Sequence, residues 1–174
     1  MSALTEKSIA VIATNGFEDS ELTAPLEAVK EAGADVTVLS TKTGEIVGKH
    51  DTTVTVDATT ADHVDTTFDA IILPGGTGNA DTIRMDADAV AIVRSHVEAG
   101  RPLGAICHAG WLLVEADVVR GRTVTSYPSL QTDLRNAGAT WVDQEVVEDG
   151  GIVTSRTPDD LPAFNAKLLE VFAQ

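Results

Sequence analysis

Cysteine is almost missing from this sequence, and so are long apolar runs. Cys107 is the only cysteine among 174 residues. No disulfide can therefore form within the chain, and the role of this thiol must be chemical, a matter of packing, or intermolecular. No stretch reaches eighteen apolar residues, which argues against a membrane-spanning helix. Residues 1–7 are too few and too polar for a signal peptide, so we expect a cytoplasmic protein.

Positive charge is also scarce. The sequence holds 12 lysine and arginine residues against 27 aspartate and glutamate residues, which gives a formal net charge of -15 at pH 7. A chain this acidic repels nucleic acid and anionic membranes, so we expect neither as a partner. The acidic residues are scattered rather than gathered in a tail. This pattern favours a high-salt organism, where dissolved ions screen the repulsion, over the alternative of an ordinary acidic protein.

Apolar residues are nevertheless plentiful, at 43% of the sequence, and the length suits a single domain spanning residues 1–174. Short apolar runs without polar alternation predict strands buried on both faces at 8–13, 35–40 and 68–73. Between the first two, apolar residues at helical spacing predict a helix over 18–32. A strand, a helix and a second strand in this order form a right-handed βαβ unit.

The rest of the chain continues the alternation of strands and helices. We expect a hairpin at the sheet's edge over 43–56 and a hairpin-like region through 146–153. Thr157 and Pro158 fit the N-cap and first position of a final helix. The sequence thus predicts a doubly wound α/β fold, with a mainly parallel sheet flanked by helices. The other predicted segments are strands at 102–106 and 123–125 and helices at 87–99, 111–114 and 129–136.

Cys107 stands where a predicted strand passes directly into a predicted helix. Small residues surround this bend, among them Gly104 and Gly110. That setting is typical of a nucleophile elbow, in which a tight turn lifts one side chain into the crevice beyond the carboxyl ends of the strands. A helix N-terminus also lowers the pKa of a thiol there, because its dipole favours the thiolate. The alternative interpretation is that Cys107 is a small buried hydrophobic residue.

Four further residues are predicted at the same edge of the sheet. His108 can act as a general acid or base. Glu18 opens the first helix and can reach the sulfur, although a first-turn carboxylate also simply stabilises a helix. Gly75 and Gly76 follow the strand at 68–73 and can offer N–H groups to an oxyanion, or can merely turn the chain.

The other histidines show no ligand spacing, so we expect no metal site and no cofactor. They are His50, His63 and His96.

Five motifs, in order along the chain, make the sequence resemble the PfpI branch of the ThiJ/PfpI family. They are GFEDSEL at 16–22, LPGG at 73–76, AICH at 105–108, TSYPS at 125–129 and TSRTPDDLP at 154–162. The resemblance implies a flavodoxin-like fold related to the class I glutamine amidotransferases. It implies Cys107 as the nucleophile, with a nearby glutamate, at Glu18, bonded to its sulfur. The family's oxyanion donors fall on the backbone of Gly76 and His108.

The resemblance also implies that the active site lies at a subunit interface of a homodimer or higher homo-oligomer. In PfpI-type members the elbow histidine pairs with a carboxylate from a neighbouring subunit, and Asp81 is the residue that matches. Tyr127 matches a tyrosine that lines the same pocket. The sequence departs from the family in two places: Ala109-Gly110 replaces the usual Gly-Pro, and the stretch from Gly76 to Asp81 is one residue longer.

The resemblance leaves several functions open. A thiolate that adds to a carbonyl serves both aldehydes and amides. We rank first a glyoxalase or deglycase that acts on reactive aldehydes or their adducts, since a small aldehyde needs no leaving-group protonation and little binding surface. An intracellular cysteine peptidase or amidase is the second hypothesis, and a redox sensor or holdase chaperone is the third. A glutamine amidotransferase is disfavoured because no histidine follows His108.

Overall fold

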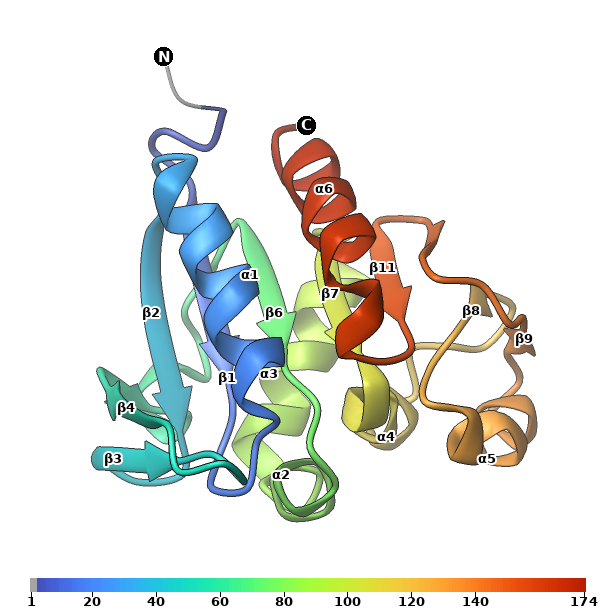
Figure 1. The fold of residues 1–174 in the computed structure, drawn as a ribbon, viewed down its shortest axis with the longest axis horizontal. Helices are drawn as coiled ribbons and strands as arrows, with labels where there is room; N and C mark the ends of the chain where they lie inside the picture. Colours follow the sequence, from blue (N-terminus) through green and yellow to red (C-terminus); the bar gives the residue numbers. More distant parts are fainter. Residues whose placement is uncertain (1–2) are drawn as a thin grey trace.

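A seven-stranded sheet forms the centre of the molecule in the computed structural model, which describes residues 3–174 (Figure 1). Its strand order is β10-β11-β7-β6-β1-β2-β5. All neighbouring strands are parallel except the edge pair β10 and β11. The strands of this sheet are β1 (Ser8–Ile12), β2 (Asp35–Ser40), β5 (Ala58–Thr59), β6 (Ala70–Leu73), β7 (Leu103–Ile106), β10 (Val147–Asp149) and β11 (Ile152–Ser155).

Helices cover both faces of the sheet. On one face lie α1 (Asp19–Glu31) and α6 (Leu161–Phe172), which stand side by side in Figure 1. On the other lie α2 (Thr77–Ile83), α3 (Ala87–Glu98), α4 (Gly110–Glu115) and α5 (Gln131–Asn136). Short 3₁₀ turns occur at Ala61–His63, Cys107–Ala109, Pro128–Leu130 and Pro158–Asp160. This arrangement confirms the predicted doubly wound α/β fold.

The central strands are buried because each faces two helical layers. In β1, Ile9 and Val11 pack with residues of α1 and α6, while Ala10 and Ile12 pack with residues of α3 and α4. All four are at most 1% exposed. Alternate side chains of a strand point to opposite faces, so a run without polar alternation suits this position. Among residues 3–174, no helix is long and apolar enough to cross a membrane.

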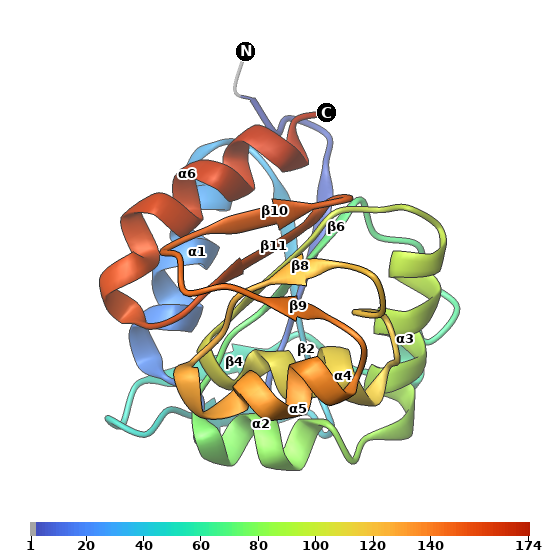
Figure 2. The ribbon, with the colours of Figure 1, turned by 90° about the vertical axis from the view of Figure 1, so that its right-hand side faces the viewer.

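Two small sheets lie beside the main one. β3 (Gly44–Val47) and β4 (Thr53–Val56) form the predicted hairpin, which is a separate antiparallel sheet rather than an extension of the central one. β8 (Thr123–Val124) and β9 (Thr140–Trp141) pair in parallel near β10 and β11, as Figure 2 shows. The sequence predicted neither β9 nor α2.

The last helix also begins differently from the prediction. Thr157 is the N-cap residue of the 3₁₀ turn Pro158–Asp160, and its side chain makes no capping hydrogen bond. The α-helix begins only at Leu161. Asp160 instead bonds to Arg156, whose Nε lies 2.9 Å from the Asp160 Oδ2. This ion pair fixes the segment that carries Thr157 and Pro158 toward the carboxyl edge of the sheet.

Candidate active site

A strained turn presents Cys107 at the carboxyl end of β7. Ile106 still has extended backbone angles, with φ -123° and ψ 145°, whereas Cys107 has a φ of +62°. A residue other than glycine rarely adopts positive φ, and such strain is concentrated at functional sites. Gly75 leaves the room that the turn requires, because a Cβ there would lie 2.8 Å from the Cys107 Cβ. This is the geometry of a nucleophile elbow.

The Cys107 side chain reaches solvent through a small pocket. The residue is 8% exposed, and it lines a cavity of about 190 Å³ formed by the loops after β1, β6 and β7, the β3–β4 turn and the start of the last helix. Its other lining residues are Glu18, Glu21, Lys49, Gly76, Thr77, His108, Tyr127, Thr157 and Pro158. A larger groove of about 570 Å³ borders α4 and α5, but neither cysteine nor histidine lines it. We therefore take the smaller pocket as the candidate site.

The carboxylate beside the sulfur belongs to Glu21, which corrects the prediction of Glu18. Glu18 is the N-cap of α1, and its Oε2 accepts hydrogen bonds from the Glu21 backbone N–H at 3.0 Å and from the Ser20 hydroxyl. Its carboxylate is thus held by its own helix, which is the role that a helix-opening acid commonly has. Glu21 lies one turn further on, with its carboxyl group against the Cys107 thiol and the Gly75 backbone.

Glu21 is a buried acid without strong hydrogen bonds. It is 0% exposed, and neither carboxyl oxygen has a hydrogen-bond partner of good geometry. Burial, and next the negative charge of Glu18, raise the pKa of Glu21 to about 8; the Cys107 thiol and the charge of Lys49 oppose this rise. Glu21 is therefore mostly protonated at pH 7, and its O–H can donate to a thiolate or to a substrate oxygen.

The expectation that a helix N-terminus lowers the pKa of Cys107 does not hold. Burial, and next the Glu21 carboxylate, raise the pKa of this thiol to about 12, while the backbone N–H groups of His108 and Gly76 oppose the rise. The helix behind Cys107 is a 3₁₀ turn followed by the six residues of α4, so its dipole is small. When Glu21 is protonated its repulsive charge vanishes, and its O–H then favours the thiolate.

His108 points back toward the sulfur although it follows Cys107 directly. Its Nδ1 lies 3.2 Å from the Cys107 Sγ, and its Nε2 lies 3.4 Å from the Thr77 hydroxyl. The ring stacks on Tyr127, with centroids 4.6 Å apart, and meets the edge of Trp111. Burial, and then the charge of Lys49, lower the pKa of His108. The imidazole is therefore neutral at pH 7 and able to accept a proton.

The two glycines after β6 have different surroundings. The Gly76 N–H faces the Cys107 sulfur, whereas the Gly75 N–H faces the Glu21 carboxyl group. Gly76 has a φ of +90°, and a Cβ there would lie 2.5 Å from the Glu18 backbone nitrogen. Only glycine fits this position. Gly76 and His108 thus offer donors beside the sulfur, while the Gly75 N–H is directed at Glu21 and its predicted oxyanion contact stays a prediction.

Tyr127 and Asp81 complete the predicted set. Tyr127 is 40% exposed and forms a wall of the pocket, and its backbone N–H donates to the Cys107 carbonyl at 3.2 Å. Asp81 is exposed on α2 and does not line the pocket. Its predicted contact with His108 of a neighbouring subunit stays a prediction.

Two further residues support the site and were missed by sequence reasoning. Asn79 is 1% exposed; its Nδ2 donates to the carbonyls of Pro74 and Gly75, and its Oδ1 accepts from the Thr14 N–H at 2.7 Å. It ties the loop after β6 to β1. Lys49 reaches the pocket from the β3–β4 turn. For Asn79, the available signal was a buried asparagine in the first turn of a short helix. For Lys49, nothing in the local sequence indicated a role.

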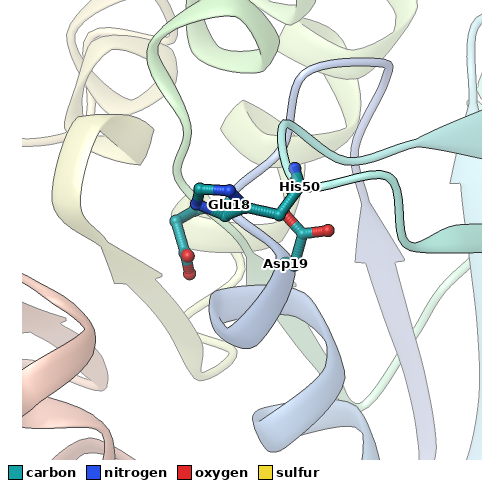
Figure 3. A group of neighbouring side chains, drawn as sticks. All are labelled: Glu18, Asp19 and His50. Carbon is teal, nitrogen blue, oxygen red and sulfur yellow. Dashed lines mark hydrogen bonds between the residues drawn. The ribbon is translucent and has the colours of Figure 1, made fainter.

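One group of side chains resembles a metal site. Ligand atoms of Glu18, Asp19 and His50 lie within 4.8 Å of one another at the start of α1, as Figure 3 shows. Asp19 accepts backbone hydrogen bonds from His50 and Thr52, both at 2.9 Å. Burial raises the pKa of Asp19, but the hydrogen bonds from Thr52 and His50 outweigh this and lower it. These bonds account for the carboxylates' positions without an ion.

Comparison with known proteins identifies the family of this chain. The model of the DJ-1/PfpI family matches residues 7–171. The chain is 44% identical over 168 residues to "Protein/nucleic acid deglycase 2" of Escherichia coli, covering 95% of this chain and 97% of that protein. It is 42% identical over 166 residues to "Putative cysteine protease YraA" of Bacillus subtilis, covering 95% and 98%. The crystal structure of Drosophila melanogaster DJ-1beta superposes with a TM-score of 0.90 at 32% identity, covering 96% and 90%.

Proposed function

This chain belongs to the DJ-1/PfpI family, and on that premise we propose that it is a cysteine-dependent enzyme that acts on reactive aldehydes or their adducts. Such an enzyme is a deglycase or a glutathione-independent glyoxalase. The name of the Escherichia coli relative, which shares 44% of its residues with this chain, supports this reaction class. A resident metal or cofactor has no part in the proposal.

One observation carries the proposal: the Cys107 sulfur lies in a cavity of only about 190 Å³, beside a carboxyl group and a neutral imidazole. Pockets for drug-sized ligands measure roughly 300–1,000 Å³. A peptide chain needs an extended groove around the nucleophile, whereas an aldehyde of a few heavy atoms fits a small cavity. The size of the pocket therefore favours a small carbonyl substrate.

The residues can take a 2-oxoaldehyde through addition and isomerisation. The Cys107 sulfur adds to the aldehyde carbon, a C–S bond forms, and the carbonyl π electrons move to oxygen. The thiol proton ends on that oxygen, with Glu21 as the relay, and the product is a hemithioacetal. His108, neutral at pH 7, takes the proton from the carbon bearing sulfur and returns it to the adjacent carbon, while the hydroxyl proton of the hemithioacetal passes to the neighbouring ketone oxygen. These two proton shifts convert the hemithioacetal into the thioester of a 2-hydroxy acid. Water then hydrolyses the thioester to a 2-hydroxy acid and restores the thiol.

Peptide or amide hydrolysis is the second candidate, because the Bacillus subtilis relative is named as a cysteine protease. In this reaction the same thiol would attack an amide carbonyl, and His108 would protonate the leaving amine. The contact between His108 Nδ1 and the sulfur, at 3.2 Å, is compatible with that step. The size of the cavity is the observation against it.

The deciding experiment compares wild type with Cys107→Ala and Cys107→Ser. Each protein receives methylglyoxal, and lactate is followed by proton NMR; in parallel each receives a fluorogenic peptide. We expect lactate from the wild type only and no peptide turnover. Peptide cleavage that requires Cys107, without lactate, would favour the peptidase. If neither substrate turns over while peroxide adds one oxygen to Cys107 and a thiol reductant removes it again, the redox-sensor hypothesis takes the place of both.

The proposal includes a homo-oligomer in which Asp81 of one subunit faces His108 of another. The exposure of Asp81 on α2 supports this arrangement. Co-refolding Cys107→Ala with Asp81→Asn tests it, because a mixed pair then holds one complete site only if Asp81 acts across the interface. Regained activity supports the trans arrangement, and activity no higher than the sum of the two variants contradicts it. Light scattering after size-exclusion chromatography measures the number of subunits.

The proposal also places the protein in the cytoplasm of a high-salt organism, on the strength of its net charge of -15. Salt then stabilises the fold by screening the repulsion between carboxylates. The melting temperature should rise steeply between low and molar KCl, and a flat curve would contradict this part.

A further inference from the structure

A lysine stands at the Cys107 pocket of a chain that is poor in positive charge. Lys49 is the one lysine or arginine among the residues that line this cavity. The whole chain has only 12 such residues and a net charge of -15. A basic residue at this pocket is therefore not explained by the number of basic residues in the chain. Its charge acts on both Glu21 and His108, whose pKa values it lowers. Lys49, although exposed, therefore shares the pocket with Cys107, Glu21 and His108.

The loop that carries Lys49 is fixed to the first turn of α1. The Lys49 N–H donates to the Phe17 carbonyl at 2.9 Å. Just after it in the chain, the N–H groups of His50 and Thr52 donate to the two oxygens of the Asp19 carboxylate; Figure 3 shows Asp19 and His50 side by side. Asp19 is 9% exposed. Part-buried hydrogen bonds thus hold the backbone of this turn against α1, and they fix the position from which the Lys49 side chain extends to the pocket.

Glycine at position 48 makes this close contact possible. A Cβ on Gly48 would lie 2.5–2.8 Å from the Asp19 carboxylate atoms. Any larger residue would push the turn away from α1 and take Lys49 with it. Gly48 therefore lets the backbone of the turn approach α1 closely, and this approach places the charge of Lys49 at the pocket.

The acids that share the pocket with Lys49 form no ion pair with it. Lys49 takes part in none of the ion pairs found among residues 3–174. The Glu18 carboxylate is turned to the N-terminus of its own helix, where it accepts from Glu21 N–H and from Ser20. Glu21 is uncharged at pH 7 because its pKa is about 8. A cation without an ion-pair partner at the mouth of a small cavity is a binding site for an anionic group.

We propose that Lys49 forms an anion subsite, and that the substrates of this pocket are small carbonyl compounds that carry a carboxylate. The carbonyl carbon lies against the Cys107 sulfur, and the carboxylate lies against the Lys49 ammonium group. Lys49 is thus a specificity-determining residue, which selects 2-oxoaldehydes ending in a carboxylate over neutral ones such as methylglyoxal. The inference deepens the proposed function and rests on it for the reaction, while the subsite itself can be measured without turnover.

Alkylation of Cys107 measures the subsite directly. Iodoacetate and iodoacetamide react with a thiol in the same way and differ in one carboxylate. Their rate constants are measured by intact mass at pH 7 and one fixed KCl concentration, for wild type, Lys49→Met, Lys49→Arg and the exposed-lysine control Lys42→Met. We expect Lys49→Met to lower the iodoacetate-to-iodoacetamide ratio about threefold to tenfold, the range that Coulomb's law gives for charges a few ångströms apart in a partly wet site.

The controls decide what the ratio means. Lys49→Arg should keep the ratio within about twofold, since a guanidinium also binds a carboxylate. Lys42→Met changes the net charge by the same amount and should leave the ratio unchanged. An equal fall in Lys42→Met and Lys49→Met, or no fall in either, overturns the inference.

Substrate kinetics separate this inference from the proposed function. The wild type and Lys49→Met receive 4,5-dioxopentanoate, which is a 2-oxoaldehyde with a carboxylate, and methylglyoxal. A fall in kcat/KM that is larger for the first compound than for methylglyoxal supports the subsite. If both aldehydes are turned over but the alkylation ratio does not depend on Lys49, the subsite is contradicted and the proposed function stands. If the alkylation ratio depends on Lys49 but neither aldehyde is turned over, the proposed function is contradicted and the subsite stands.

Discussion

Replacing the buried acid, Glu21→Gln, should change how the stability of the protein depends on pH. The pKa of Glu21 rises from 4.5 to about 8 on folding. The folded state therefore keeps a proton that the unfolded chain has lost at pH values between these two numbers. The contribution of this proton to the free energy of unfolding is fully present below pH 4.5 and is lost as the pH rises to about 8. The slope is about 1.4 kcal/mol per pH unit for one proton.

The size of the effect follows from the same two numbers. A rise from 4.5 to about 8 corresponds to roughly 5 kcal/mol at full strength, and structural relaxation and entry of water lower this value. Glutamine has nearly the shape of a protonated glutamate and does not titrate. Relative to wild type, Glu21→Gln should thus gain up to about 3.5 kcal/mol of unfolding free energy between pH 5 and pH 8, the part of the full effect that falls in this range. Cys107, with its pKa of about 12, does not titrate in this range.

Urea unfolding followed by circular dichroism, at half-unit steps from pH 5 to pH 8 in constant KCl, measures the difference. Contributions of groups that do not interact with Glu21 are common to both proteins and cancel. Glu31→Gln is the control, because Glu31 is exposed at the other end of α1 and should follow the wild-type curve. Parallel curves for wild type and Glu21→Gln would refute the assignment of Glu21 as a protonated acid.

Three further changes test the supports of the site. Asn79→Ala removes three buried hydrogen bonds and should lower the unfolding free energy by about 2–4 kcal/mol in urea. Arg156→Met leaves the Asp160 carboxylate buried without its partner; it should cost about 2 kcal/mol near pH 7 by urea unfolding, and less as Asp160 is protonated toward pH 3. Gly75→Ala places a methyl group 2.8 Å from the Cys107 Cβ and should slow iodoacetamide labelling of Cys107 at least about tenfold. A labelling rate like that of wild type would contradict the packing argument.

The parts of the fold that local patterns control could be predicted from the sequence. The residues of β1 are apolar on both faces because helices cover both, and this produces a run without alternation. Cys107 could be predicted at an elbow because a strand and a helix meet there without a loop. α2 escaped prediction because its seven residues, including Gly78 and Asn79, carry little helical periodicity.

The glutamate could not be chosen from spacing alone. Glu18 and Glu21 stand three residues apart, so both lie on the same side of α1. The structure separates them by their depth: Glu18 caps the helix, while Glu21 is fully buried one turn further in. The favourable interaction of an acid with a helix N-terminus would have given Glu18 its observed role.

Lys49 and Asp81 show a different limit. Lys49 reaches the pocket because the β3–β4 hairpin docks on α1 through Asp19, and this contact joins segments about thirty residues apart. The sequence around Lys49 contains no sign of that docking. Asp81 depends on a second copy of the chain, so no pattern within one chain determines what it contacts.

The central claim is that Cys107, although only 8% exposed, reacts through its pocket in the folded protein. Intact-mass measurement after iodoacetamide treatment of native protein tests it, because the chain has a single cysteine. We predict one carbamidomethyl group on native wild type at pH 7.5 and none on Cys107→Ala. Labelling that occurs only after denaturation would contradict the account.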